Sequence, residues 1–204
     1  MSTESCWKCG KSSAESLFCR FCNSLQPPTP DYFAFFNLDR RLNLDLDELQ
    51  RRYYSLSRMI HPDRFQRGTP REKRFSLDAT AILNDAFRKL RDPVARAEYV
   101  LKEEGFTPAE RKSKRVPPEL LEEVFEVNMA LEKLRGGDLS LRPAVETALG
   151  KFRRLRDDAN TELTALFVEF DGGGGREALA KIRALLDRRS YIDSLIEEVE
   201  EAFV

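Results

Sequence analysis

The sequence of 204 residues contains a single histidine, His61, so a catalytic histidine pair and a histidine-rich metal site are both excluded. It also lacks a Ser or Cys nucleophile elbow and a Gly-rich phosphate loop. These motifs are common signs of hydrolases and nucleotide-binding enzymes, so a catalytic role for His61 is disfavoured. Strand signals are nearly absent as well, which leaves helices as the expected elements.

Neither an excess of one charge nor a long apolar run is present. The formal net charge is −1, which excludes a bulk electrostatic affinity for nucleic acid. No apolar run approaches the roughly 18–20 residues that span a membrane, so no membrane partner is expected. The opening "MSTESCWKCG" has neither a signal-peptide core nor an Arg-rich presequence. We therefore expect a cytoplasmic chain, or one in the mitochondrial matrix if the sequence is a mature form.

The residues that are present divide the chain into segments. All four cysteines lie in 1–30, which ends in the Pro-rich "QPPTP". We expect a compact helical unit over 31–105, a charged connector containing prolines over 106–118, and a second helical unit over 119–204. The fold class is therefore expected to be all-α, with a small N-terminal cysteine module.

Capping residues and apolar stripes place the helices of 31–105. Asp45 and Glu48 make a capping-box pattern that opens a predicted helix over about 46–60. The run "TPRE" (69–72) is a stronger start signal and opens a second helix, and a shorter one follows over about 94–104. The apolar stripes of the first two helices are Leu49, Tyr53, Leu56 and Ile60, then Phe75, Ala79, Ile82, Ala86 and Leu90.

Three further helices are predicted in the tail, near 117–135, 141–170 and 176–203. Each has one apolar stripe at a period of 3.6, and the loops between them are short, so a three-helix bundle is expected. The run "DGGGGR" (171–176) is expected to be a loose loop between two of these helices. The stripes are Leu120, Val124, Val127, Leu131 and Leu134; Val145, Leu149, Phe152, Leu155, Leu163 and Leu166; and Leu179, Ile182, Leu186, Ile196, Val199 and Phe203.

The cysteines form two C-x-x-C pairs nine residues apart, Cys6 with Cys9 and Cys19 with Cys22. Two such knuckles complete a tetrahedral four-sulfur site, and structural Zn2+ is the favoured metal ion. Iron could occupy the same sulfurs. The cysteines could also form two disulfides or a redox dithiol, but the lack of a secretory signal and of a strand–helix junction disfavours both. With four protein ligands no open position remains for catalysis.

The tripeptide His61-Pro62-Asp63 lies at the exit of one predicted helix and before the next. A residue before proline is pushed out of the helical conformation, so the first helix must end there. An ordinary helix stop would explain the tripeptide in an arbitrary helical protein. The surrounding charge is unusual, however, because residues 48–67 contain five basic residues and only two acidic ones. The basic residues are Arg51, Arg52, Arg58, Arg64 and Arg67.

This region resembles the J-domain of DnaJ-type co-chaperones. It opens with "DYFAFFNL", places His-Pro-Asp between two helices, and continues with "ILNDAFRKLRDPVARAEYVL". The resemblance implies docking on a 70-kilodalton heat-shock chaperone of the DnaK type and stimulation of its ATPase, with no chemistry by the chain itself, which is thus not an enzyme. It also implies that His61, Pro62 and Asp63 are the essential contacts. The steering charges would be Arg51, Arg52, Arg58 and Arg64.

A second apolar line runs along the first tail helix. Leu121, Phe125 and Met129 follow at intervals of four, rotated by roughly 100° from the core stripe, and Glu122 and Glu126 bound them. The line is either a patch that faces a partner or a surface that packs on the J-domain-like unit or widens the core of its own bundle.

The order of a four-cysteine module, an early J-domain and an acidic helical tail resembles the HscB-type J-proteins of iron–sulfur cluster assembly. That resemblance implies a DnaK/HscA-type chaperone and an IscU-type scaffold as partners. The scaffold would bind Leu121, Glu122, Phe125, Glu126 and Met129, together with Tyr191 on the last helix. Met129 and Glu122 depart from the residues usual in the family.

Two different functions remain open beside this one: a J-domain co-chaperone for a different client, and a thiol- or metal-handling protein. The role of the zinc module also remains open. It could stabilise the N-terminus, pack on the J-domain, form a docking surface or mediate a homodimer.

Overall fold

The computed structural model describes residues 5–12, 16–106 and 120–203. It divides into two compact units, 1–99 and 100–204, and each is described by itself. Within the described ranges the only strand-like pairing is two isolated bridges in the cysteine module, so the all-α prediction is confirmed. No helix in those ranges is long and apolar enough to cross a membrane. The predicted connector lies, apart from its first residue, outside the described ranges, and the predicted domain boundaries stay a prediction.

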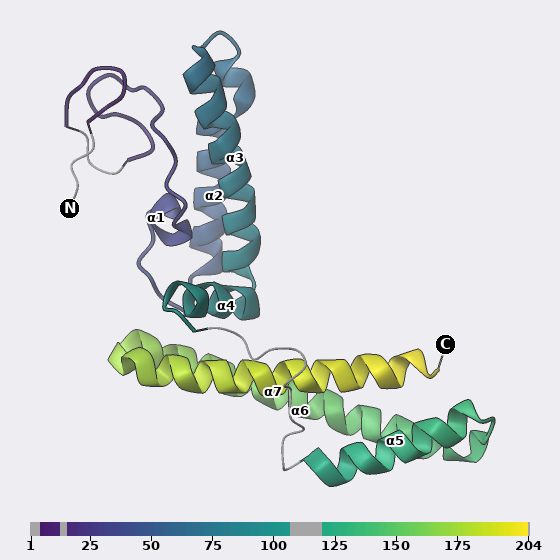
Figure 1. The fold of residues 1–204 in the computed structure, drawn as a ribbon. Coiled ribbons are helices and arrows are strands. Elements are labelled where there is room, and N and C mark those ends of the chain that lie inside the picture. The colour runs from purple at the N-terminus through teal and green to yellow at the C-terminus, as the bar shows by residue number, and fades with distance from the viewer. Residues whose placement is uncertain (1–4, 13–15, 107–119, 204) are drawn as a thin grey trace. The chain divides into compact units, whose positions relative to one another are not determined.

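The first unit is an antiparallel hairpin of α2 (Leu46–Ile60) and α3 (Pro70–Arg91), with the short helix α1 (Tyr32–Phe36) packed against both (Figure 1). A 3-10 turn, η1 (Pro62–Phe65), joins the two long helices, and α4 (Pro93–Glu103) follows α3. The core of the hairpin consists of fully buried apolar side chains, which include Phe33, Phe36, Leu42, Leu49, Ile60, Ala79, Leu83, Ala86 and Leu90.

The predicted starts of the two hairpin helices are confirmed. The Asp45 carboxylate accepts the amide hydrogens of Asp47 and Glu48, while the Glu48 carboxylate accepts from Arg52, so only the Asp45 half of the capping box predicted there is present. Thr69 and Glu72 make a reciprocal capping box at the start of α3. The buried face of α3 is turned slightly from the predicted one. Ser76 and Leu83 are buried, whereas Phe75 and Ile82, predicted for the same face, are half-buried. Apolar spacing alone did not distinguish these neighbouring positions.

The second unit consists of α5 (Leu121–Arg135), the 3-10 turn η4 (Leu139–Leu141), α6 (Arg142–Glu169) and α7 (Gly175–Glu201). α6 and α7 are a long antiparallel pair, and the shorter α5 lies along α6 near the C-terminal end of α7 (Figure 1). The predicted three-helix core is therefore present in the part of the α6–α7 pair against which α5 packs. It joins the α5 stripe to Val145, Leu149 and Phe152 of α6 and to Ile192, Leu195, Ile196 and Val199 of α7.

The glycine run between α6 and α7 is a tight turn rather than the loose loop expected. The chain kinks within Phe170–Gly174, where Gly173 leaves the helical conformation, and enters α7 at once. Gly173 has a φ of 102°, which L side chains rarely adopt. A Cβ on Gly174 would lie 2.7 Å from the Glu169 carbonyl oxygen and 2.9 Å from the Ala178 Cβ. Glycine at these two positions is what allows the two helices to turn so closely.

Candidate functional sites

The four cysteine thiols meet at one point in the N-terminal module. Their sulfur atoms all lie within 4.8 Å of one another, with 3.7 Å between Cys6 and Cys22 and 3.8 Å between Cys9 and Cys19. A tetrahedron of sulfurs about 2.3 Å from a central zinc has edges of about 3.8 Å, whereas a disulfide needs about 2.05 Å. The geometry fits four ligands of a single metal ion and does not fit disulfides.

The two C-x-x-C pairs form equivalent knuckles. The amides of Lys8 and Phe21 each donate to the first sulfur of their own knuckle, at 3.4 Å. Each knuckle then closes through a residue with positive φ, Gly10 in the first and Asn23 in the second. Such amide–sulfur bonds stabilise the thiolate form that a metal requires.

The pKa values of two thiols of the cluster, Cys6 and Cys19, are lowered. Burial alone raises the pKa of Cys6, but hydrogen bonds with the Ser24 hydroxyl and with the amides of Cys9 and Lys8 lower that pKa to about 5. The Cys6 thiol is therefore readily converted to the thiolate that binds metal.

The cysteine module contacts the first turn of α3 through the two residues inside its first C-x-x-C pair. The Trp7 ring meets the Phe75 ring edge-on, with 6.1 Å between centroids, and the Arg71 guanidinium lies 5.2 Å from the Trp7 ring centroid. The Lys8 ammonium lies 3.1 Å from the Glu72 carboxylate. Sequence reasoning did not identify these contacts. The only signal was that Trp7 and Lys8 lie between two ligands.

His61, Pro62 and Asp63 form a compact exposed turn between α2 and α3. The Asp63 amide donates to His61 Nδ1 at 3.3 Å, and the Asp63 carboxylate lies 3.5 Å from the same nitrogen. Both side chains remain largely in solvent, at 54% and 73% exposed. Pro62 is the first residue of the 3-10 turn that follows. An imidazole that is held by the Asp63 amide and exposed to solvent can contact a second protein.

Hydrogen bonds beneath the tripeptide fix this turn. The buried Ser76 hydroxyl donates to the Ile60 carbonyl at 2.6 Å, so the last turn of α2 is held against α3. The Gly68 amide donates to the Phe65 carbonyl at 2.8 Å and closes the loop at its other end. The His61 and Asp63 side chains are thus exposed while their backbone is anchored.

The predicted steering arginines differ in how exposed their side chains are. Arg51, Arg58 and Arg64 are exposed. Arg52 is half-buried. Its guanidinium donates to the backbone carbonyls of Phe36, the last residue of α1, and Asn37, the residue that caps α1. It also donates to the Glu48 carboxylate on its own helix. Arg52 therefore ties α1 to α2, and less of its charge faces solvent.

The predicted scaffold-binding residues of α5 form an exposed apolar line. Leu121, Phe125 and Met129 are 55%, 66% and 44% exposed, and Glu122 and Glu126 beside them are exposed as well. The line therefore does not widen the core of its own bundle. Large apolar side chains grouped in this way on a surface are typical of a contact site for another protein.

Tyr191, the predicted aromatic partner of that line, lies on α7 and is half-buried against the core shared by α5, α6 and α7. Burial, with a smaller effect of the Glu198 carboxylate, raises the pKa of its phenol. It stays neutral and offers an apolar ring with a hydroxyl at its edge.

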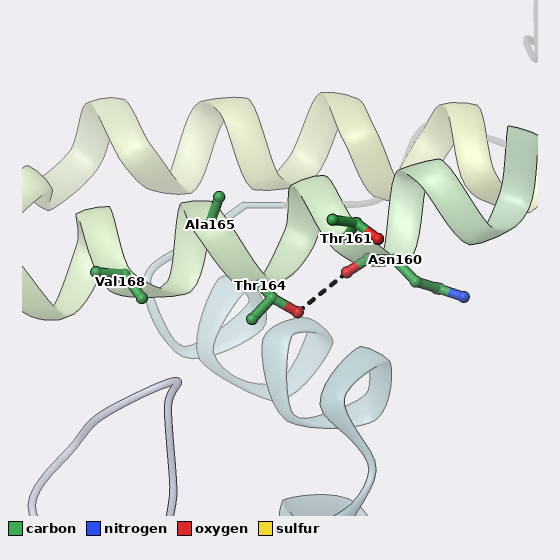
Figure 2. Close-up of a pocket in the computed structure, with 5 residues that line it drawn as sticks. All are labelled: Asn160, Thr161, Thr164, Ala165 and Val168. Atoms are coloured by element: carbon green, nitrogen blue, oxygen red, sulfur yellow. Dashed lines mark hydrogen bonds between the residues drawn. The ribbon is translucent and has the colours of Figure 1, made fainter.

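A shallow hollow on α6 has none of the features of a catalytic site. Its lining is Asn160, Thr161, Thr164, Ala165 and Val168, all on one helix (Figure 2). The Thr164 hydroxyl donates back to the Asn160 carbonyl at 3.1 Å, as threonine commonly does within a helix. No charged side chain is among these five, and both threonine hydroxyls donate to carbonyls of their own helix.

Comparison with known proteins adds family information to this geometry. No protein-family model matches the chain. The iron–sulfur cluster co-chaperone protein HscB of Mus musculus is 32% identical, over 87% of this chain and 76% of the mouse protein. The Homo sapiens protein of the same name is 30% identical with the same coverage.

Two solved structures are similar as well. The crystal structure of human co-chaperone protein HscB has a TM-score of 0.74 at 25% identity, covering 98% of this chain and 99% of the human one. The chaperone HscB from Vibrio cholerae has a TM-score of 0.63 at 26% identity, covering 84% and 96% of the two chains.

Proposed function

The chain belongs to the HscB family of iron–sulfur cluster co-chaperones, and on that premise we propose that it stimulates the ATPase of a DnaK/HscA-type heat-shock chaperone while presenting an IscU-type scaffold to it. The observation that carries the proposal is the exposed turn of His61, Pro62 and Asp63 on an anchored backbone. The chain performs no chemistry in this scheme. It binds two proteins and biases the nucleotide cycle of one of them.

The chaperone contact consists of the tripeptide turn and the exposed arginines of α2. Arg51, Arg58 and Arg64 would attract an acidic surface and orient the encounter, while His61 and Asp63 would make the specific contacts. Arg52 contributes mainly by fixing α1 to α2, as its internal hydrogen bonds indicate.

The scaffold contact would be the apolar line of Leu121, Phe125 and Met129, edged by Glu122 and Glu126, with Tyr191 of α7 as a further contact residue. An apolar centre with a charged rim is the usual composition of a specific protein interface. The scaffold site and the tripeptide turn belong to different units of the chain, so both partners would be bound at once. Their coupling then comes from simultaneous binding to one chain.

The metal of the cysteine module would be zinc. Four thiolates at tetrahedral spacing satisfy every coordination position of zinc, and such closed sites stabilise a fold rather than catalyse a reaction. Cys6, Cys9, Cys19 and Cys22 would each supply one sulfur. The compartment would be the one in which the scaffold resides, the cytoplasm or the mitochondrial matrix.

The test is the ATPase rate of a DnaK/HscA-type chaperone measured with the chain alone, with the IscU-type scaffold alone, and with both. The proposal predicts stimulation by the chain alone and a more than additive rate with both. Stimulation by the chain that the scaffold leaves unchanged would instead indicate a J-domain co-chaperone for another client. No stimulation in any combination would contradict the proposal.

A further inference from the structure

The contacts of Trp7 and Lys8 form a continuous path from the cysteine cluster to the loop that holds the tripeptide. Both residues lie between Cys6 and Cys9, and the Lys8 amide donates to the Cys6 sulfur. The Trp7 indole N–H donates to the Leu25 carbonyl at 2.7 Å, so the ring is fixed to the module before it meets α3. A metal ion that closes this knuckle therefore determines where both side chains point.

On α3 the path arrives at Glu72. One oxygen of its carboxylate accepts from Lys8, while the other accepts from the Thr69 amide at 3.0 Å and completes the capping box. That second oxygen also lies beside Gly68, since a Cβ placed there would come within 3.2 Å of it. Gly68 in turn closes the tripeptide loop by donating to the Phe65 carbonyl. The Lys8 contact thus acts on the residue that caps α3 and borders the end of the loop.

We infer that Trp7 and Lys8 are positioning residues for the His61-Pro62-Asp63 turn, and that metal binding by the four cysteines orders this turn through Glu72 and Phe75. The inference deepens the proposed function, on which it rests for its effect on the chaperone. It gives the cysteine module a role beyond holding its own fold. Loss of the metal, by chelation or by oxidation of the thiols by an added oxidant, would loosen the turn and weaken docking on the chaperone.

Hydrogen exchange of the loop amides tests the inference without any partner. The amides of Arg64, Gln66 and Gly68 are hydrogen-bonded within the loop and report its opening directly. Loss of an exposed ion pair should speed exchange by roughly 1.5- to 5-fold, and loss of an aromatic pair by roughly 2- to 12-fold. We expect this rise over 61–69 in Lys8→Ala, in Trp7→Ala and in metal-stripped protein.

The matched control is Lys11→Ala, which removes a lysine of the same module whose ammonium lies over the Phe21 ring and not on α3. It should leave exchange over 61–69 unchanged. Exchange in the second half of α3, over 83–91, should stay at the wild-type rate in every variant. The metal content of each variant, measured alongside, shows whether Trp7→Ala still binds its ion. Lys8→Ala removes only an exposed side-chain contact, so it tests the inference even if Trp7→Ala loses the metal.

Two further results separate positioning from general stability. Combining Lys8→Ala with metal removal should add little to metal removal alone, because both changes act on one path. In the ATPase assay, Lys8→Ala should raise the concentration of chain needed for half-maximal stimulation and leave the maximal rate unchanged.

Unchanged exchange over 61–69 in all three perturbed forms would overturn the inference. An equal rise over 61–69 and 83–91 would also overturn it, because it would show a general loss of stability. If the wild-type chain fails to stimulate any DnaK-type chaperone, the proposed function fails, whereas the exchange result still decides the positioning role.

Discussion

Replacing Leu121 and Phe125 together by serine removes most of the exposed apolar surface of α5 without disturbing its buried face. That face consists of Val124, Val127, Leu131 and Leu134, all buried in the second unit. The double variant should therefore keep the helical content and thermal midpoint of the wild type. What it loses is the surface proposed to bind the IscU-type scaffold.

The size of the effect follows from how much surface each side chain has left to bury. Leu121 and Phe125 are 55% and 66% exposed. Complete burial of such a side chain contributes about 1.5–3 kcal/mol, so the exposed fractions correspond to about 1–2 kcal/mol each and about 2–4 kcal/mol together. A loss of that size raises the Kd for the scaffold by roughly 30- to 700-fold.

Isothermal titration calorimetry of the chain with the scaffold measures this Kd. The matched control is Val168→Ser, which removes an apolar side chain that is 58% exposed on α6 and outside the proposed site. Its Kd should equal that of the wild type. A double variant that binds as tightly as the wild type, or a control that weakens binding as much, would refute the assignment of this surface.

Three further predictions concern the loop and the tight turn. Ser76→Ala leaves the Ile60 carbonyl without its buried donor and should lower the free energy of unfolding by about 1–3 kcal/mol in urea titration; an unchanged value would show that the hydrogen bond does not anchor α2. Gly174→Ala places a Cβ 2.7 Å from a backbone oxygen of α6 and should cost about 1–3 kcal/mol in the same assay. Gly172→Ala, where nothing lies within 4 Å, should cost far less, and equal losses would contradict the packing argument. A hydrogen bond from the Thr69 amide and, after it, one from Lys8 hold the pKa of Glu72 below its ordinary 4.5. The stabilisation from the ionised Glu72 carboxylate is therefore fully present above pH 4.5 and is lost as the pH falls through the lowered pKa. The difference in urea midpoint between wild type and Glu72→Gln should accordingly be constant near neutrality and vanish on acidification; a difference that persists at low pH would contradict the charge-based explanation.

Local signals in the sequence were sufficient for the longer helices and for the clustering of the four cysteines, whereas the short helix α1 was not predicted. Asp45 and the run at 69–72 are capping residues whose effect is confined to one helical turn, so their neighbours in sequence decide the outcome. The spacing of the cysteines acts in the same way, because a two-residue interval brings both thiols of a knuckle to one ion. The stripe of α5 was also predicted correctly, since every residue in it is buried.

Contacts between distant segments could not be read in this way. The half-buried position of Arg52 depends on where α1 ends against α2, which no pattern around Arg52 records. Trp7 and Lys8 meet α3 across more than sixty residues of chain, and their only local sign was a place between two ligands. The glycine run indicated a turn, but how tight the turn is depends on the packing of α6 against α7.

The most direct test of the account is the ATPase stimulation of a DnaK/HscA-type chaperone by the chain carrying His61→Gln. The His61 side chain is 54% exposed, so the substitution should leave the fold and scaffold binding intact. The account predicts that stimulation is lost while the scaffold still binds with the wild-type Kd. Full stimulation by the His61→Gln chain would contradict it.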